Sequence, residues 1–596
     1  MEGATATLDG FTARLMAEAP PLARIESLVG AEIRPNGATD FEIVQSVGAS
    51  VGTALVSPDL NTCDDCLSEL DDPGDRRYRY PFLNCTNCGP RFTITLRTPY
   101  DRPDTTMAAF EMCEACRAEY ENPVDRRFHA QPNACERCGP RVWVESADGA
   151  VVEGDPIEAV RASIAAGEVV AIKGVGGFHL ACDATSDQAV KRLRERKRGA
   201  DQPFALMVRD VATAERLVHL TTEDSRLLTS RERPIVLARA RDDGAMSSLV
   251  APGNRMLGVM LPYTPLHHLL LEPGDVWVMT SGNLSSEPIV TGNEEARSAL
   301  GGIADLFCLH DRDIHVPCDD SVVRILDGAE LPVRRSRGYA PYPVALPFDV
   351  SPILAVGGEL KATFCLADDR QAFMSQHIGD MENLETLDAF SRAVAHMEGL
   401  FRIKPEVIAT DLHPGYLSTR WAERVAGDRA VIHVQLFDAV SSLAGVRQQV
   451  TYEAQAAIEF ETLLGSSNSV EYRFGVEPEG DLIEIDAGPL VGAVVDDVRS
   501  GMPQGEIAAR FHQGVISMIV EVAEILRSAH GLETVGLSGG VFQNVRIADG
   551  AASSPPPVRF LAWTRSMLLM RGRSSRSLVR TTQTRFLKRC GATPRE

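Results

Sequence analysis

The sequence contains no run of 18 apolar residues, and this absence argues against a membrane-spanning helix. Its first residues, MEGATATLDGFTARL, lack the basic segment followed by an apolar segment that a secretory signal requires. It also lacks an excess of positive charge, since 60 Lys and Arg residues stand against 82 Asp and Glu residues. Proteins that bind nucleic acid or membrane surfaces in general are normally basic. We therefore expect a cytoplasmic protein with no membrane partner.

The chain is long enough for several domains. It has 596 residues of ordinary composition, and a domain usually takes roughly 100–200 residues, so we expect three to five domains. Residues 1–50 predict a small opening unit with an amphipathic helix ended by Pro20 and Pro21, followed by a short strand, FEIVQS. Residues 51–150 have few apolar runs and much Pro, Gly and Arg, so this region cannot build a large apolar core and needs metal ions or covalent cross-links to fold.

Two regions with alternating strand and helix patterns follow. In 155–345, runs such as VVAIKGV and DVWVMT predict buried strands, and Ser186 is a candidate N-cap for the helix SDQAVKRLRERKR. In 350–544, apolar residues spaced by three and four from Leu384 to Phe401 form one helix face. A second long helix is expected over GEIAARFHQGVISMIVEVAEIL. The predicted fold class is multidomain, with α/β and α+β parts.

The segment 545–596 differs in character from the rest. It holds ten Arg and one Lys against Asp549 and Glu596, and its runs SSPPP and RGRSSRS are typical of disorder. A basic solvated tail is one interpretation, and a shifted reading frame after codon 544 is the other.

Eight of the 13 cysteines form a tandem array in which the spacing C-x2-C-x18-C-x2-C occurs twice. Two C-x2-C turns complete a tetrahedron of thiolates, so we predict two structural Zn2+ sites whose binding energy supports folding of this segment. Disulfides or redox thiols are the alternative, and a reducing compartment disfavours disulfides. We expect pairing within each repeat, with crossed pairing left open. The predicted ligands are Cys63, Cys66, Cys85, Cys88, Cys113, Cys116, Cys135 and Cys138. The other five are predicted to be ordinary buried or incidental thiols: Cys182, Cys308, Cys318, Cys365 and Cys590.

The array, with a CGPR element after each repeat, resembles the zinc region of the HypF family of hydrogenase-maturation carbamoyltransferases. Several clusters in 155–345 support this resemblance: the glycine turn KGVGGFH, the basic run RLRERKR, the run TSGN and the run DDS. Taken singly, the basic run is more often a solvated helix face and the glycine run is more often only a turn. In this order they resemble the YrdC-type fold, in which such elements surround ATP and a carbamate-like group. The resemblance implies nucleotide contacts at Lys197, Arg198, Ser281, Asn283 and Ser321.

The region 350–544 resembles the actin-like carbamoyl-transfer domain of the same family. Its matching runs are GGELKATF, SQHIGDMEN, TDLHPGYLST, TYEAQAAIE and LSGGVFQN. The family-motif positions in them are His413, Tyr416, Ser418, Glu453, Gly539 and Gly540. Without the resemblance, the sequence predicts that His413 is only part of a capped turn before Pro414.

The sequence also departs from the family pattern. Residues 1–50 resemble only the second half of an acylphosphatase-like domain, so the anion-binding loop of that domain is expected to be absent. After Gln435 the chain continues directly into a segment resembling a much later part of the family, so a His-pair metal motif is expected to be missing and His433 is predicted to be structural. After Asn544 the chain resembles nothing in the family. No catalytic residue is therefore assigned.

The resemblance implies an enzyme that takes carbamoyl phosphate and ATP with Mg2+, forms carbamoyl-adenylate, and passes the carbamoyl group to a cysteine of a HypE-type maturation protein. We expect this copy to be impaired, since supply and transfer need the missing elements. Two alternatives remain: a threonylcarbamoyl-adenylate synthase acting in tRNA modification, and a non-catalytic zinc protein that binds the maturation partner or RNA. RNA binding is implied by the fold alone.

Overall fold

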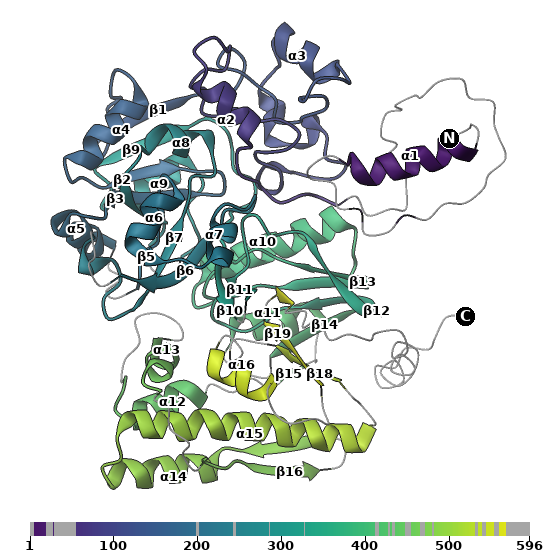
Figure 1. Ribbon diagram of the computed structural model, residues 1–596, viewed down its shortest axis with the longest axis vertical. Coiled ribbons are helices and arrows are strands. Elements are labelled where there is room, and N and C mark those ends of the chain that lie inside the picture. The colour runs from purple at the N-terminus through teal and green to yellow at the C-terminus, as the bar shows by residue number, and fades with distance from the viewer. Residues whose placement is uncertain are drawn as a thin grey trace.

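The computed structural model describes residues 5–19, 25, 28, 55–197, 202–241, 246–284, 287–326, 328–411, 416–426, 430–431, 436–447, 455–464, 471–479, 482–530, 534–538, 541, 544–552, 559–564 and 566–567. In Figure 1 a cysteine-rich part at the top adjoins a large sheet, a smaller sheet lies below, and a helical part lies at the bottom. Among the described helices, none is both long and apolar enough to cross a lipid bilayer.

The first described part is mainly helical. Helix α1 (Thr5–Ala17) agrees with the predicted opening helix, whereas FEIVQS lies outside the described residues. In the cysteine-rich part, α2 (Asp64–Asp71) and α3 (Glu114–Glu121) each begin directly after the first cysteine of a repeat. Three short 3-10 helices lie between them: Phe92–Ile94, Arg102–Asp104 and Thr106–Ala109. Buried cysteines make up part of the small apolar core here, as expected for a segment that needs metal ions or covalent cross-links to fold.

The large sheet has eleven strands in the order β1-β9-β2-β3-β8-β4-β7-β6-β10-β11, and β5 pairs with β6. The strands are β1 (Val142–Ser146), β2 (Val170–Lys173), β3 (Phe178–Asp183), β4 (Leu206–Val208), β5 (Val218–His219), β6 (Ile235–Ala240), β7 (Met256–Met260), β8 (Val276–Ser281), β9 (Leu306–His310), β10 (Val322–Leu326) and β11 (Ala329–Arg334). The helices are α4 (Pro156–Ala165), α5 (Asp187–Lys197), α6 (Val211–Leu217), α7 (Thr222–Leu228), α8 (Pro265–Leu270) and α9 (Asn293–Leu300), with a 3-10 helix at Ser248–Val250. In β2, Ala171 packs in one apolar cluster and its neighbour Ile172 packs in another. Because neighbouring side chains point to opposite faces of a sheet, both faces of this sheet are covered.

Local predictions in this region agree with the structure, but one boundary does not. The run VVAIKGV contains β2, DVWVMT contains most of β8, and the Ser186 hydroxyl accepts a hydrogen bond from the Ala189 amide at 3.3 Å at the start of α5. The predicted cysteine-rich domain extends to residue 150, whereas β1 pairs antiparallel with β9 and belongs to the sheet. The alternating run VWVES forms this edge because its Val144 is buried opposite Cys308.

A smaller sheet has the order β13-β12-β14-β15. Its elements are β12 (Pro343–Ala355), β13 (Cys365–Met374), β14 (Val407–Asp411), β15 (Ala430–Val431), α10 (Leu384–Phe401) and α11 (Leu417–Ala426). The bounds of α10 confirm the predicted helix face, and Asn383 caps it by accepting from the Thr386 amide at 2.8 Å. Aromatic residues such as Phe364, Phe390 and Trp421 form the core between helix and sheet. The predicted boundary between 345 and 350 falls inside the continuous strand β12.

The helical part is built on one long helix, α15 (Gln504–His530), which contains the predicted second helix. Its other elements are α12 (Leu436–Leu443), α13 (Gln455–Thr462), β16 (Gly475–Glu479), β17 (Leu482–Asp486), α14 (Gly488–Arg499), β18 (Thr534–Ser538), α16 (Val545–Ala552), β19 (Arg559–Thr564) and β20 (Ser566–Met567). Regular structure therefore continues past residue 544, and the predicted start of a disordered tail there is wrong. The reason is that α16 buries Ile547 and Ala551, is capped by Asn544, and leads to β19 in parallel pairing with β18.

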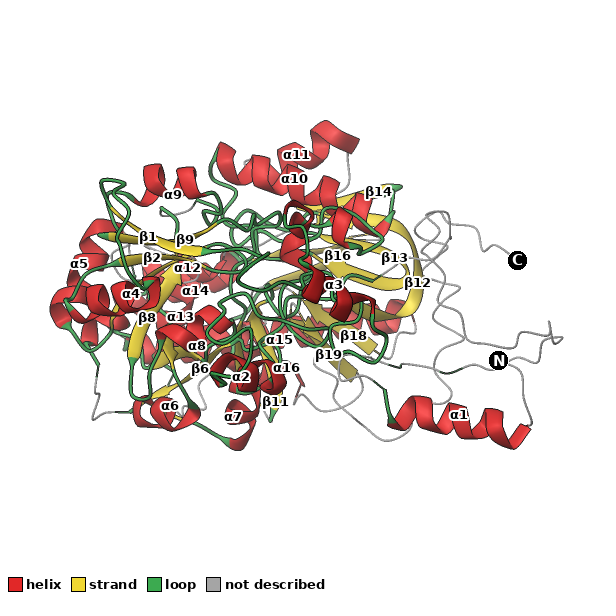
Figure 2. Cartoon of the chain, turned by 90° about the horizontal axis from the view of Figure 1, so that it is seen from above, coloured by secondary structure: helices red, strands yellow, loops and turns green. Residues whose placement is uncertain are grey.

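Seen from above, the large sheet with α4, α5 and α9 lies at one end of the molecule, and the smaller sheet with β12, β13 and β14 lies at the other (Figure 2). The segment that joins the two sheets, 335–342, is therefore placed near the middle, where a site can take residues from both.

Candidate metal centres and nucleotide cavity

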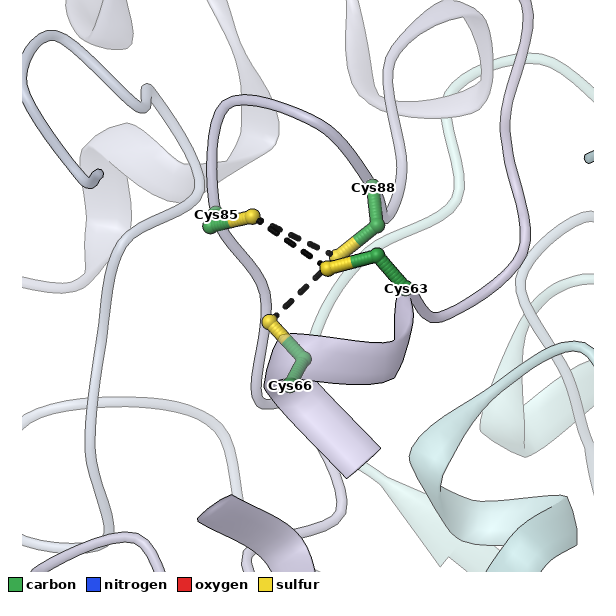
Figure 3. Close-up of side chains that lie close together, drawn as sticks. All are labelled: Cys63, Cys66, Cys85 and Cys88. Carbon is green, nitrogen blue, oxygen red and sulfur yellow. Dashed lines mark hydrogen bonds between the residues drawn. The ribbon is translucent and has the colours of Figure 1, made fainter. Parts of the chain in front are cut away.

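The eight repeat cysteines form two clusters of four, and each cluster takes all its members from one repeat. This agrees with pairing within repeats and not with crossed pairing. Figure 3 shows the sulfur atoms of Cys63, Cys66, Cys85 and Cys88 turned toward one another. Their Sγ atoms are 3.6 Å apart for Cys63 and Cys85, 3.5 Å for Cys66 and Cys88, and 3.9 Å for Cys85 and Cys88.

The sulfur spacing fits a zinc ion. A Zn–S bond of about 2.3 Å in a regular tetrahedron places sulfur atoms about 3.8 Å apart. In the second cluster the Cys113–Cys135 and Cys135–Cys138 sulfur distances are both 3.8 Å, and the Cys116–Cys138 distance is 3.6 Å. Four thiolates leave no position for water, so these clusters are consistent with structural zinc sites.

A cavity of about 320 Å³ lies beside the large sheet and is lined by residues of that region and of loops next to the strands of the smaller sheet. From the large-sheet region come Lys197, His179, Ser281, Asn283 and Arg334, and the segment after β13 contributes three more: His377, Ile378 and Asp380. Lys361 also lines it. Four carboxylates also line the cavity: Glu287, Asp319, Asp320 and Asp380. Cations with hydroxyl and amide groups suit a nucleotide phosphate, and carboxylates suit the Mg2+ that a nucleotide carries.

Lys197, the last residue of α5, is the best-supported of the predicted nucleotide contacts. Its ammonium group donates hydrogen bonds to the Ser281 carbonyl oxygen at 2.6 Å and to the Thr280 hydroxyl at 3.2 Å. Burial lowers the pKa of Lys197 to about 8. A buried ammonium group without a carboxylate at hydrogen-bond distance is well suited to receive a phosphate group.

Ser281 and Asn283, two further predicted nucleotide contacts, also line the cavity at the end of β8. The Ser281 hydroxyl donates to the Asn283 side-chain oxygen at 2.9 Å, and the Asn283 amide donates to the Glu287 carbonyl oxygen at 2.7 Å. Ser321 behaves differently: it is fully buried, donates to the Arg337 carbonyl oxygen at 2.8 Å and accepts from the Ser336 amide at 2.7 Å. Its hydroxyl therefore holds the segment 335–337 against β10.

A buried ionic chain at the cavity wall joins residues that the sequence places in separate clusters, and this contact was not predicted. Asp320 accepts hydrogen bonds from Arg337 Nε at 2.6 Å and from His179 Nε2 at 2.9 Å. Burial opposes ionisation of Asp320, but Arg337 and His179 outweigh it and lower the pKa of this carboxyl. Its neighbour Asp319 has a pKa raised by burial. The available signal was His179 in the glycine turn KGVGGFH, because a histidine directly after a buried glycine turn lies close to any ligand there.

The predicted transfer-domain residues are only partly described. Tyr416 and Ser418 lie at the start of α11, where both are buried and the Leu417 amide donates to the Glu359 carboxylate at 2.7 Å. Neither lines the cavity described above. Five predicted site residues lie outside the described residues, as do His433 and Cys590: Arg198, His413, Glu453, Gly539 and Gly540.

Four cysteines outside the array are buried or half-buried, as predicted for ordinary thiols. Burial raises the pKa of Cys182 and of Cys308 to about 12. The pKa of Cys365 is raised to about 11 by the same cause, and that of Cys318 is also raised. These groups are therefore neutral thiols at physiological pH.

Comparison with known families assigns most of the chain. Residues 62–95 and 112–145 match the family described as HypF finger, and residues 162–336 match the one described as telomere recombination, of the Sua5, YciO and YrdC type. Residues 349–440 match the HypF Kae1-like domain, and residues 435–560 match the second subdomain of a carbamoyltransferase Kae1-like domain. The last match extends past residue 544, which agrees with the ordered α16.

Individual relatives give the same assignment. A crystal structure of full-length HypF in the phosphate- and nucleotide-bound form is 35% identical, with a TM-score of 0.82 over 94% of this chain and 89% of that one. T. kodakarensis HypF is 30% identical, with a TM-score of 0.79, 94% of this chain and 90% of that one. Carbamoyltransferase HypF2 of Cupriavidus necator is 49% identical over 72% of this chain, and HypF of Rhizobium leguminosarum is 48% identical over 69%. These matches span only 56% and 54% of those two relatives.

Proposed function

Since the chain belongs to the HypF family of carbamoyltransferases, we propose that it activates a carbamoyl group with ATP and passes it to a cysteine thiol of a HypE-type protein in [NiFe]-hydrogenase maturation. In this proposal carbamoyl phosphate is the source of the carbamate, ATP enters with Mg2+, and zinc fills both cysteine clusters, while supply of carbamate and transfer are impaired in this chain relative to its family. We also propose the division of labour expected from the sequence: residues 155–345 activate and residues 350–544 transfer, while residues 1–50 belong to an acylphosphatase-like unit.

The observation that carries the proposal is the shared cavity. Its wall combines Lys197, Ser281 and Arg334 of the region that matches the YrdC-type family with Lys361 and His377 of the region that matches the Kae1-like domain. The wall thus brings the two regions together, which supports a proposal in which the intermediate is made and used close to the same cavity. This proximity limits loss of the intermediate to water.

The chemistry follows from the charges of the wall. A carbamate oxygen attacks the α-phosphorus of ATP, a new O–P bond forms, and pyrophosphate leaves. Lys197 and Arg334 would stabilise the negative charge that develops on the phosphoryl oxygens. In the second half-reaction the acceptor sulfur forms an S–C bond with the carbamoyl carbon, the C–O bond to AMP breaks, and the thiol proton goes to solvent or to a basic side chain.

Exchange of labelled pyrophosphate into ATP tests the first step on the full, zinc-loaded chain. We expect exchange that depends on carbamate or carbamoyl phosphate. Lys197→Met removes the buried cation and is expected to slow exchange by about 100-fold or more. Lys191→Met is the matched control, because Lys191 lies on the same helix with its side chain 68% exposed.

Two results would contradict the proposal. Exchange that requires threonine with bicarbonate would instead support a threonylcarbamoyl-adenylate synthase. No exchange from folded, zinc-loaded protein, together with retained binding of the maturation partner, would support a non-catalytic role.

A further inference from the structure

The two cysteine clusters are linked by arginine side chains that cross from one repeat to the other. Arg76 of the first repeat donates two hydrogen bonds to the Cys116 sulfur of the second, at 3.5 and 3.4 Å. Arg126 of the second repeat donates two to the Cys66 sulfur of the first, at 3.2 and 3.3 Å. The exchange is reciprocal, and equivalent residues of the two repeats make equivalent contacts.

A glutamate on the receiving helix holds each crossing arginine. Glu119 of α3 accepts from Arg76 at 2.6 Å and also binds Arg77. Glu69 of α2 accepts from Arg126 at 2.6 Å and also binds Arg127. Each glutamate follows the sulfur acceptor of its own helix by three residues, so the two groups lie on one helix face.

The second arginine of each pair is more buried and anchors the crossing loop to the opposite repeat. Arg77 is 2% exposed and donates to the Ala134 carbonyl oxygen at 2.9 Å and to the Asn133 side-chain oxygen at 3.0 Å, both in the second repeat. Arg127 donates to the Asn84 carbonyl oxygen in the first repeat at 3.1 Å. The loop that carries each arginine pair is therefore shaped by the opposite repeat.

Electrostatics give this exchange a consequence for metal binding. Four thiolates around one Zn2+ carry a net charge of about −2, which is costly to bury unless cations or hydrogen-bond donors offset it. The arginine donors come from a loop that lies between the two C-x2-C turns of the other repeat, whereas the Asn87 amide donates to the Cys85 sulfur within the first repeat at 3.3 Å. Zinc in the other repeat would order the loop that carries the arginines. Part of the neutralisation of each metal site therefore comes from the opposite finger.

We propose that the crossing arginines couple the two zinc sites, so that each finger holds zinc tightly only when the other is filled. Arg76 and Arg126 act as positioning residues that tune a metal site they do not ligate. The proposal rests on zinc in both clusters and is independent of the carbamoyl chemistry.

The test replaces one crossing arginine at a time in the full chain. Zinc-loaded Arg76→Gln and Arg126→Gln are exposed to a chelator and N-ethylmaleimide, and alkylation of each cysteine is followed by mass spectrometry. Removal of a residue beside a metal ligand commonly weakens binding about 10–100-fold, so we expect at least ~10-fold faster alkylation of the affected finger. For Arg76→Gln that finger is the second, at Cys113, Cys116, Cys135 and Cys138. For Arg126→Gln it is the first.

The order of alkylation is the internal control. Under the proposal the finger that loses its arginine donor is alkylated first and the other finger follows as zinc is lost, whereas general unfolding would expose both fingers with the same time course. Arg117→Gln is a further control, because Arg117 adjoins Cys116 but its side chain is 51% exposed and pairs with Glu111 at 3.7 Å. Alkylation that begins in the finger that carries the substitution, simultaneous alkylation of both fingers, or no change in either variant would overturn the proposal.

Native mass spectrometry during partial chelation measures the coupling itself. Two equal and independent sites give about half of the molecules one zinc when total occupancy is one half. We expect a smaller one-zinc population for the unaltered chain and a larger one for Arg76→Gln. If about half or more of the unaltered molecules carry one zinc ion, the sites are not coupled, whatever the alkylation assay shows.

Discussion

Replacing Lys197 with methionine should stabilise the fold while it removes activity. The pKa of Lys197 is lowered by burial from 10.5 to about 8, which means that folding disfavours its charged form. Each pH unit of difference between the folded and unfolded pKa corresponds to about 1.4 kcal/mol, so the charged lysine costs the folded state about 3 kcal/mol below pH 8. Methionine has a similar length and no charge, so it avoids this cost. The Thr280 hydroxyl and the Ser281 carbonyl each lose one hydrogen bond, but the Ser281 carbonyl keeps the Asn283 amide as a donor at 3.1 Å, so the offset is smaller than the gain.

The pH dependence of this effect has a definite sign. Between about pH 8 and 10.5 the unfolded chain still holds the Lys197 proton while the folded chain has lost it, so stability of the unaltered protein rises with pH in that window. The stability lead of Lys197→Met should therefore be constant below pH 8 and should shrink as pH rises toward 10.5.

Urea unfolding at several pH values measures the difference. Trp277 in β8 is buried three residues before Thr280, a hydrogen-bond partner of Lys197, and serves as the reporter when Trp143, Trp421 and Trp563 are replaced by phenylalanine in both proteins. The other titrating groups contribute equally to the free energy of unfolding of both proteins, so their contributions cancel in the comparison. A methionine variant that is less stable at pH 7, or a lead that does not change between pH 8 and 10.5, would refute the reasoning.

Three further outcomes are expected. Asp320→Asn leaves the buried Arg337 without its carboxylate partner and should lower the unfolding free energy by roughly 3–5 kcal/mol, measured with the same Trp277 reporter; a loss well below this would mean that the pair is not energetically isolated from solvent. Phe390→Ala opens a cavity under the smaller sheet and should cost about 3–5 kcal/mol, seen as an earlier urea transition of Trp421, which packs on Phe390 at 5.2 Å between ring centroids. Removal of zinc by a chelator should make residues 62–138 sensitive to protease, with protection restored by zinc and not by magnesium; protection that persists without zinc would show that the segment folds on its own core.

The zinc ligands could be predicted from the sequence because their signal is local and repeated. A C-x2-C turn needs only four consecutive residues, and the second copy with the same spacing makes chance unlikely to explain it. The helix from Leu384 to Phe401 was predictable for a similar reason, since periodicity and an Asn383 cap both lie within the segment itself.

The cavity could not be predicted in full, because its members meet only through the tertiary fold. Lys197, Ser281 and Asn283 belong to one set of family runs, and Lys361 and His377 lie in the runs GGELKATF and SQHIGDMEN of the other sheet region. No local signal indicates that the two sets line one cavity. The boundary at 544 failed for another reason: the predominance of arginine in the final residues concealed the short apolar face of α16.

Ser321 is a family-motif position, but its hydroxyl contacts protein groups and does not line the cavity, and this difference leads to a prediction. Its hydroxyl has two buried protein partners, and removing it leaves the Ser336 amide and the Arg337 carbonyl unsatisfied at a cost of about 1–3 kcal/mol each. Ser321→Ala should therefore lower stability clearly while the dissociation constant of ATP, measured at a temperature where both proteins are folded, changes little. A tenfold weaker ATP affinity with unchanged stability would instead show that the hydroxyl binds nucleotide, as the sequence pattern implies. The geometry favours the first outcome, because this hydroxyl holds the turn that carries Arg337, and Arg337 in turn fixes Asp320 beside His179 at the cavity wall.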